Sequence, residues 1–228
     1  MLIRDAGDGL EVFMLRRTLA AAFGSGMYVF PGGKVDAVDG TDVERAHRLA
    51  AVRECFEEAG VLLAHDVDSH PVTDGHPILA RRHDVHDGTS EMLQLCDEHN
   101  LTIDLDQLAF VSHWITPIGE SRRFDTRFYV APAPHGQTSV HDDSETIASL
   151  WARPEDALQR QASGELTMMP PTIKNLQYLS GFRTVAEAMT ASHALPTPSV
   201  ILPRIRHDAD GRILGVALPG DDDYEEHS

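Results

Sequence analysis

The alternation of apolar and polar positions along the chain predicts several short β-strands separated by turn residues. Runs of roughly four to eight residues, rich in branched or aromatic side chains and bounded by Gly or Pro, are typical of strands. Two apolar runs flank Asp210 and Gly211, a dipeptide that favours a tight turn, and so predict a hairpin over about 200–218. Further extended segments are predicted at residues 10–16, 27–30, 108–115 and 124–131.

One long helix and several short ones are predicted from helical spacing and from residues that start or end helices. Thr41 and Glu44 have the spacing of a capping box, and the helix that they open is predicted to run from about 42 to 59. Gly60 suits the left-handed backbone position just beyond a helix end. Shorter helices, some opened by proline, are predicted at 77–82, 91–98, 154–161 and, as one or two segments, 172–192.

The composition is that of a folded chain with a strong negative charge. Of the 228 residues, 42% are apolar, which is enough to bury a sizeable core, and the length suits one domain with insertions. The 36 Asp and Glu against 19 Lys and Arg give a net charge of −17, which argues against nucleic acid or an anionic membrane as partner. No apolar run approaches the ~20 residues that span a bilayer. Two cysteines, Cys55 and Cys96, are too few for a disulfide framework, so we expect a reducing, cytoplasmic location.

The helix predicted over 42–59 separates carboxylates from apolar side chains. With about 100° of rotation per residue, Glu54, Glu57 and Glu58 fall on one face. Their mutual repulsion is relieved either on a solvated acidic surface or by coordination of a hard divalent cation. Arg53 lies four residues before Glu57, where it can orient that carboxylate. The opposite face is apolar and consists of Leu49, Val52, Phe56 and Ala59.

The residues around this helix resemble the Nudix box of the Nudix hydrolases. Residues 53–61 have the pattern Arg-Glu-x-x-Glu-Glu-x-Gly-apolar, and Phe-Pro-Gly-Gly precedes them at 30–33. On this resemblance the box is identified as residues 33–61. The resemblance implies that Mg²⁺ or Mn²⁺ is bound by Glu54, Glu57 and Glu58.

The box departs from the family pattern in its length and at one acidic position. Asp39 stands where the family pattern has a glutamate, and thirteen residues separate it from Arg53, six more than in that pattern. Either Asp39 or Glu44, from the start of the helix, therefore takes the place of the missing glutamate.

Further motifs resemble the branch of the family that is related to peroxisomal coenzyme A diphosphatase. The likeness covers roughly residues 10–160 and includes motifs at 15–17, 28–33, 114–117 and 122–126. It implies hydrolysis of coenzyme A or acyl-coenzyme A to 3′,5′-ADP and (acyl-)phosphopantetheine. Two alternatives stay open. One is the same chemistry on ADP-ribose, NADH or a dinucleotide, and the other is a nucleotide-binding sensor without turnover.

The implied reaction is attack of water on one phosphorus of a diphosphate, which needs cations and geometry more than a covalent nucleophile. The catalytic candidates are Glu58 or Glu145 as general base, together with Arg53. The substrate-binding candidates are Gly32 and Gly33 of the glycine loop and Arg122, Arg123 and Arg127.

The three arginines are candidates because a guanidinium fork suits a pair of phosphate oxygens. On a strand over 124–131 and the residues before it, Arg123 and Arg127 are predicted to share one face, with Arg122 on the other. For each arginine, a solvent-facing ion pair with an acidic residue is an equally good interpretation.

The resemblance implies an α+β fold, an α/β/α sandwich with a mixed β-sheet between helices. We expect one Nudix hydrolase domain over 1–228, with a helical insertion at about 65–107 and a C-terminal helical and hairpin extension at about 170–218. The expected partner is a small-molecule nucleoside diphosphate derivative, without nucleic acid or membrane. A homodimer stays open as the oligomeric state.

Overall fold

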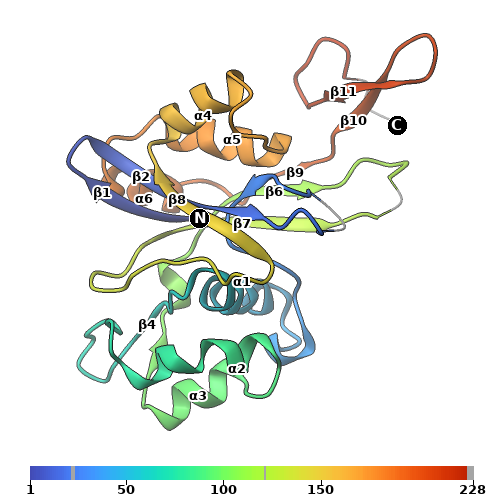
Figure 1. The fold of residues 1–228 in the computed structure, drawn as a ribbon. Coiled ribbons are helices and arrows are strands. Elements are labelled where there is room, and N and C mark those ends of the chain that lie inside the picture. Colours follow the sequence, from blue (N-terminus) through green and yellow to red (C-terminus); the bar gives the residue numbers. More distant parts are fainter. Residues whose placement is uncertain (22–23, 121, 225–228) are drawn as a thin grey trace.

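A mixed β-sheet lies between two groups of helices in the computed structural model of the protein, which describes residues 1–21, 24–120 and 122–224 (Figure 1). Helices α1 (Val43–Ala59), α2 (Arg82–His86) and α3 (Met92–Glu98) lie on one side of the sheet. Helices α4 (Pro154–Ala162), α5 (Pro170–Leu179) and α6 (Val185–His193) lie on the other. This arrangement confirms the predicted α/β/α sandwich.

The main sheet has the strand order β3-β2-β1-β7-β6-β9, and β8 also pairs with β2. The pairs β1–β7 and β6–β9 are parallel and the remaining pairs are antiparallel, so the sheet is mixed. Its strands are β1 (Leu2–Ala6), β2 (Gly9–Arg17), β3 (Tyr28–Val29), β6 (Ala109–Ile115), β7 (Asp125–Pro132), β8 (Thr146–Ala152) and β9 (Val200–Ile201).

Within the described residues, two small antiparallel ribbons and three short 3-10 helices accompany the main sheet and the α-helices. The ribbons are β4 (Ala64–His65) with β5 (Thr102–Ile103), and β10 (Arg204–His207) with β11 (Ile213–Ala217). The 3-10 helices are η1 (Ala37–Asp39), η2 (Pro77–Arg81) and η3 (Leu105–Gln107). None of the helices in the described part of the chain has the length and apolar character that a membrane crossing would require.

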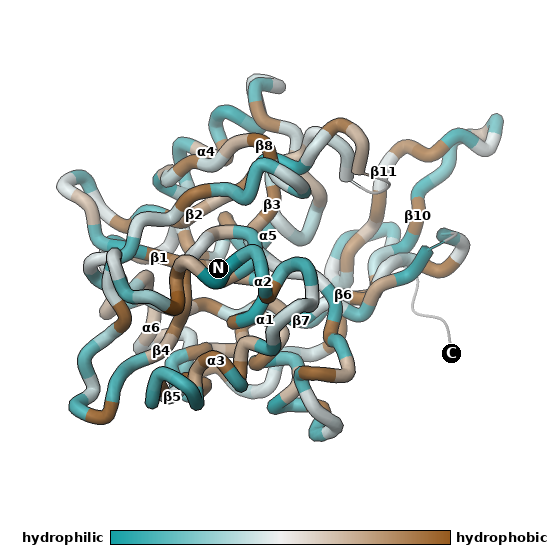
Figure 2. Tube along the Cα trace, turned by 60° about the horizontal axis from the view of Figure 1, so that its bottom comes forward, coloured by the Kyte–Doolittle hydropathy of each residue, from teal (hydrophilic) through white to brown (hydrophobic). Residues whose placement is uncertain are grey.

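Strand β2 contributes side chains to both halves of the hydrophobic core, because successive residues of a strand point to opposite faces of the sheet. Phe13 and Leu15 lie in the core that includes Val52 and Phe56 of α1. Val12 and Met14 lie in the second core, which includes residues of α4, α5 and α6. Figure 2 shows β2 as a largely hydrophobic stretch of the trace. The box helix is therefore anchored to the sheet by its apolar face.

The N-cap of helix α1 lies one residue later than predicted. The side chain of Asp42 accepts a hydrogen bond from the N–H of Arg45 at 2.8 Å, so Asp42 and not Thr41 is the N-cap. The predicted capping box is wrong because an aspartate directly before the first turn offers its carboxylate to that N–H instead. At the other end, Gly60 has the left-handed conformation (φ 70°) that was predicted for it.

Most of the predicted elements are present, with shifted ends. The segment predicted over 172–192 is two helices, since the chain leaves helical geometry after Ser180 and a new helix is capped by Thr184. The terminal hairpin is shorter than predicted, because 200–201 form β9 and pair with β6. Strands β1 and β8 were not predicted. Both lie directly beside β2 in the sheet.

Candidate active site

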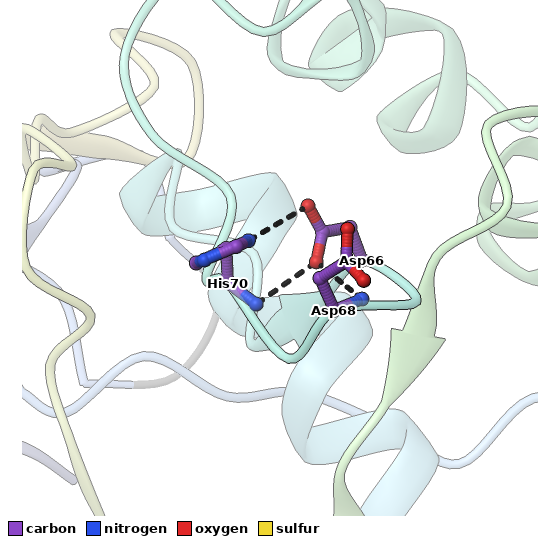
Figure 3. Close-up of side chains that lie close together, drawn as sticks. All are labelled: Asp66, Asp68 and His70. Carbon is purple, nitrogen blue, oxygen red and sulfur yellow. Dashed lines mark hydrogen bonds and ion pairs between the residues drawn. The ribbon is translucent and has the colours of Figure 1, made fainter.

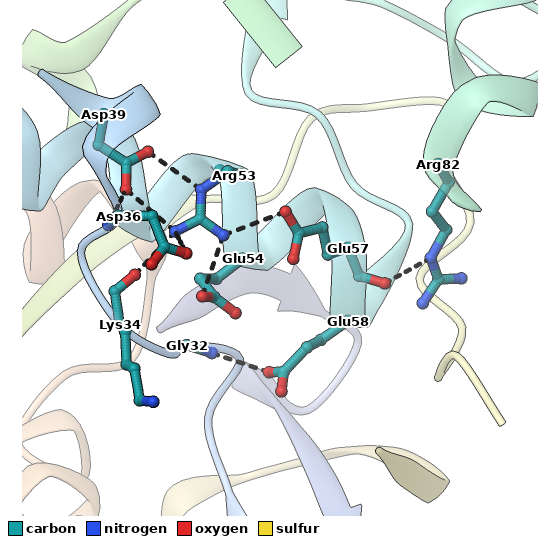
Figure 4. A network of polar contacts seen from close by, with 9 residues as sticks. All are labelled: Gly32, Lys34, Asp36, Asp39, Arg53, Glu54, Glu57, Glu58 and Arg82. Carbon is teal, nitrogen blue, oxygen red and sulfur yellow. Dashed lines mark hydrogen bonds and ion pairs between the residues drawn. The ribbon is translucent and has the colours of Figure 1, made fainter. Parts of the chain in front are cut away.

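The glycine loop runs close against the C-terminal half of α1 (Figure 4). A Cβ added to Gly33 would overlap the carboxylate of Glu54, so any other residue there requires the loop or the Glu54 side chain to move. The N–H of Gly32 donates a hydrogen bond to Oε2 of Glu58 at 2.9 Å. Both glycines therefore contact glutamates of the box through the backbone. Their predicted role in substrate binding stays a prediction.

Arg53 is buried at the centre of the site, and each of its five N–H groups donates to an acceptor (Figure 4). Nε and Nη2 bind the two oxygens of Asp39, both at 3.0 Å, and Nη2 also binds the carbonyl of Lys34 at 2.7 Å. Nη1 binds one oxygen each of Glu54 and Glu57, both at 3.1 Å. The contact with Glu57 is the one expected from the spacing. No N–H of Arg53 is left over for another partner, and its predicted catalytic role stays a prediction.

Asp39, and not Glu44, lies beside the box arginine. The carboxylate of Asp39 is buried, and besides Arg53 it accepts the backbone N–H of Asp36 at 2.8 Å. Glu44 is exposed and forms an ion pair with Arg127 at 2.7 Å. Of the two candidates for the missing glutamate, Asp39 is therefore the one that the fold joins to the box.

Burial disfavours the charged forms of the Glu54 and Glu58 carboxyl groups, and the neighbouring donors offset this only in part. Burial raises the pKa of Glu54 to about 7, against the lowering effect of Arg53 and with a further increase from Glu57 and Glu145. Burial likewise raises the pKa of Glu58 to about 8, although the hydrogen bond from Gly32 opposes the change. Buried carboxylate oxygens with uncompensated charge are the donors that a hard divalent cation takes. The residues therefore fit a metal site.

Glu145 is exposed directly before β8 and lies near this cluster. Its negative charge contributes to the raised pKa of both Glu54 and Glu58. Its backbone carbonyl accepts the N–H of Thr18, just beyond the end of β2, at 2.9 Å. The fold thus brings Glu145 to the box glutamates, although about ninety residues separate them in sequence.

The three candidate arginines do not form the predicted pattern. Strand β7 begins at Asp125, so Arg122 and Arg123 precede it, and the prediction that Arg123 and Arg127 share a strand face is wrong. The Arg123 Nε donates to the carbonyl of Thr116 at 3.1 Å, across the loop that joins β6 to β7. Arg127 pairs with Glu44. Substrate binding by these arginines stays a prediction.

Two residues near the site were missed by sequence reasoning. Arg82, the first residue of α2, donates from Nε to the carbonyl of Glu57 at 2.7 Å and so satisfies the last turn of α1 (Figure 4). Asp142 is 8% exposed and accepts the backbone N–H groups of Glu145 and Thr146. Aspartate before Ser and Thr is a known turn signal, so the role of Asp142 was within reach of the sequence. The role of Arg82 was not.

A second acidic group lies on an exposed turn after β4 (Figure 3). Among the described residues, Asp66, Asp68 and His70 are the group of three whose ligand atoms lie within 4.8 Å of one another. The box glutamates are more widely spaced than this. The Asp66 side chain accepts the N–H groups of Asp68 and His70, both at 2.9 Å, so the turn explains why these side chains gather.

Known proteins resemble the chain over most of its length. The proteins named acyl-coenzyme A diphosphatase NUDT19 from Homo sapiens and Gallus gallus are each 28% identical to it, over 97% and 95% of this chain and 74% and 73% of their own lengths. A Caenorhabditis elegans protein named putative nudix hydrolase 7 is 32% identical over 75% of this chain and 56% of its own length.

A solved structure and a family model agree with these relatives. The crystal structure of a NUDIX hydrolase from Alicyclobacillus acidocaldarius matches with a TM-score of 0.76 at 28% identity, over 86% of this chain and 95% of that one. The family model described as the NUDT19 Nudix domain matches residues 41–179, which include the box helix and Glu145. The chain therefore belongs to the NUDT19 Nudix domain family and is a pyrophosphohydrolase of the Nudix type.

Proposed function

We propose that the protein hydrolyses the diphosphate bond of coenzyme A or acyl-coenzyme A, giving 3′,5′-ADP and (acyl-)phosphopantetheine, with Mg²⁺ or Mn²⁺ as cofactor. The proposed substrate is supported by the likeness, over nearly the whole chain, to proteins named acyl-coenzyme A diphosphatase. The observation that carries the chemistry is the buried glutamate cluster with its excess of negative charge.

In this proposal Glu54, Glu57 and Glu58 hold the metal. When bound there, a divalent cation neutralises charge on the diphosphate oxygens and makes a coordinated water more acidic. Arg53 keeps Glu57 and Glu54 in place from one side, and Gly32 does the same for Glu58 from the other. These contacts fix three carboxylates before substrate arrives, which removes the need to reorganise them during the reaction.

Glu145 is the proposed general base. It is exposed, whereas Glu58 is buried and already accepts a hydrogen bond from Gly32. The carboxylate of Glu145 takes a proton from water as the water oxygen forms a bond to one phosphorus. The bond from that phosphorus to the bridging oxygen breaks, and the other phosphate leaves with the bridging oxygen. A positioned base of this kind contributes about 10²–10⁴-fold to the rate.

Product analysis tests the proposal. The enzyme with Mg²⁺ or Mn²⁺ is incubated separately with coenzyme A, an acyl-coenzyme A, ADP-ribose and NADH, with a chelator as control. We expect 3′,5′-ADP from the coenzyme A compounds, faster than any product from the others, and no turnover with chelator. AMP formed from ADP-ribose at a higher kcat/KM would assign a different substrate. Turnover that persists with chelator would show that the reaction does not depend on the metal.

A further inference from the structure

The segment that carries Glu145 is organised around one carboxylate. Oδ2 of Asp142 accepts the hydroxyl of Ser144 and the backbone N–H of Glu145, the latter at 3.0 Å. Oδ1 accepts the backbone N–H of Thr146 at 2.9 Å and its hydroxyl at 2.5 Å. Four donors thus converge on one side chain, and hydrogen bonds to an ionised carboxylate are stronger than those between neutral groups. Asp142 and Thr146 are both buried.

The same segment is anchored to the elements that carry the rest of the site. The N–H of Val140 donates to the carbonyl of Ala59, at the end of α1, at 2.9 Å. Arg82 binds the carbonyl of Glu57 and also reaches the carbonyl of His141, at 3.5 Å. On the other side, the carbonyl of Glu145 accepts the N–H of Thr18. Residues 140–146 are therefore held against both α1 and β2, and Asp142 sets the shape of the turn between these anchors.

We propose that Asp142 is the positioning residue for Glu145: its carboxylate fixes the turn of 142–146 and thereby holds the Glu145 side chain beside Glu54 and Glu58. The Glu145 side chain is exposed, and the hydrogen bonds found for this residue within the described part of the chain come from its backbone. The restraint comes from its backbone, through the N–H held by Asp142 and the carbonyl held by Thr18. This inference rests on the proposed function, because it takes Glu145 as the base of that reaction.

The test replaces Asp142 by asparagine, which has nearly the same shape but only one acceptor oxygen. The hydroxyls of Ser144 and Thr146 can rotate to accept from the new amide, whereas the backbone N–H of Glu145 or of Thr146 cannot. The matched control is Asp74→Asn, since Asp74 likewise accepts the N–H and hydroxyl of one threonine, Thr138, on an exposed loop outside the site.

We expect Asp142→Asn to lower kcat by about 10-fold or more and to leave KM within about 2-fold, because a base out of position costs part of its 10²–10⁴-fold contribution. The double variant Asp142→Asn with Glu145→Gln is expected to be no slower than Glu145→Gln alone, since both changes remove the same contribution. Asp74→Asn is expected to leave kcat unchanged. Losses that multiply in the double variant would overturn the proposal.

Hydrogen exchange provides a readout without metal or substrate. In Asp142→Asn we expect faster exchange of the amides of Glu145 and Thr146, with unchanged protection in β2 and α1. Unchanged exchange at both amides would contradict the proposal. If Asp142→Asn does not fold, Ser144→Ala removes one donor from Oδ2 and is expected to lower kcat in the same direction by a smaller factor. An unchanged kcat in that variant would then overturn the proposal.

These outcomes separate the inference from the proposed function. If Glu58→Gln abolishes hydrolysis of acyl-coenzyme A while Glu145→Gln does not slow it, the function stands and the positioning role fails. If the wild-type enzyme does not hydrolyse coenzyme A compounds at all, the proposed function fails, and the exchange of the Glu145 amide still reports whether Asp142 holds the turn.

Discussion

The three glutamates of the box differ in what balances their charge. Glu57 is paired with Arg53, and Glu54 shares the same guanidinium. Glu58 accepts a neutral backbone N–H from Gly32 and is buried, which raises its pKa to about 8. A buried carboxylate with so little compensation is costly for the fold unless a cation binds. The cluster is therefore better explained by metal binding than by stability.

Replacing Glu58 or Glu57 by glutamine tests this explanation at single residues. Each change replaces a carboxyl group by a neutral amide of nearly the same shape, which is a much weaker ligand for a divalent cation. We expect turnover to fall by about 10²-fold or more, since electrostatic groups at reacting centres act on that scale. We also expect Glu58→Gln to unfold at the same temperature or higher, because it replaces a buried carboxyl group that is costly to ionise by a neutral amide. Near-normal turnover in both variants would show that Glu57 and Glu58 do not bind a metal that the reaction needs.

Gly33→Ala tests whether close approach of the loop to α1 is required. The added methyl group overlaps the Glu54 carboxylate, so either the loop or Glu54 must move. We expect a loss of about 1–3 kcal/mol in the free energy of unfolding, as for overpacked sites, together with lower turnover. The control is Gly7→Ala, because Gly7 has no positive φ and an added Cβ there meets no atom within 4 Å. If the two variants melted at the same temperature, the close approach at Gly33 would not be required for stability.

At the scale of elements, the site depends on how α1 is joined to the loop before it. Arg53 joins α1 to Asp39 of η1 and to the carbonyl of Lys34. Asp39 is 3% exposed, so without its partner it would be a buried, unpaired charge. The arginine therefore contributes to the site and to stability through the same contacts.

We predict that Arg53→Ala lowers the free energy of unfolding by about 3–5 kcal/mol, the range for breaking a buried ion pair. Arg53→Lys keeps the charge but not the paired contact with Asp39, so it should lose less stability and still lose turnover. Arg45→Ala is the control on the same helix, because Arg45 is exposed. Denaturant unfolding measures these differences. If Arg53→Ala lowers the free energy of unfolding no more than Arg45→Ala does, the contacts of Arg53 do not stabilise the fold as proposed.

Local patterns predicted the box helix and failed where contacts are distant in sequence. The helical period placed Leu49, Val52, Phe56 and Ala59 on one face, and all four are buried. The pairing of β1 and β8 with β2 is a property of the assembled sheet, and their short runs alone did not indicate it. The same holds for Arg82, which lies 25 residues from the carbonyl that it binds.

Arg127 and Asp39 show the same limit at the site. Phosphate binding and a surface ion pair were equally compatible with an arginine at 127, and only the fold shows Glu44 beside it. Asp39 and Glu44 were both compatible with the lengthened box, because its extra residues leave the family's spacing unable to show which carboxylate contacts Arg53. The structure resolves this choice in favour of Asp39 through two hydrogen bonds to Arg53.

At the scale of the whole molecule, the net charge of −17 opposes the approach of an anionic substrate. Salt screens this repulsion, since the Debye length falls from about 30 Å at ~0.01 M to about 8 Å at ~0.15 M. With metal kept saturating, we therefore predict that KM for coenzyme A decreases as salt rises over this range. Initial rates at several substrate concentrations measure it. A KM that increases with salt would instead indicate a cationic path to the site.

The proposed metal site consists of the box glutamates and of no other acidic group. Anomalous diffraction from crystals soaked in MnCl₂ checks this proposal, because it locates Mn²⁺ independently of activity. We expect an anomalous peak within coordination distance, about 2.0–2.3 Å, of carboxylate oxygens of Glu54, Glu57 or Glu58. A peak only at Asp66, Asp68 and His70, with none at the box, would contradict it.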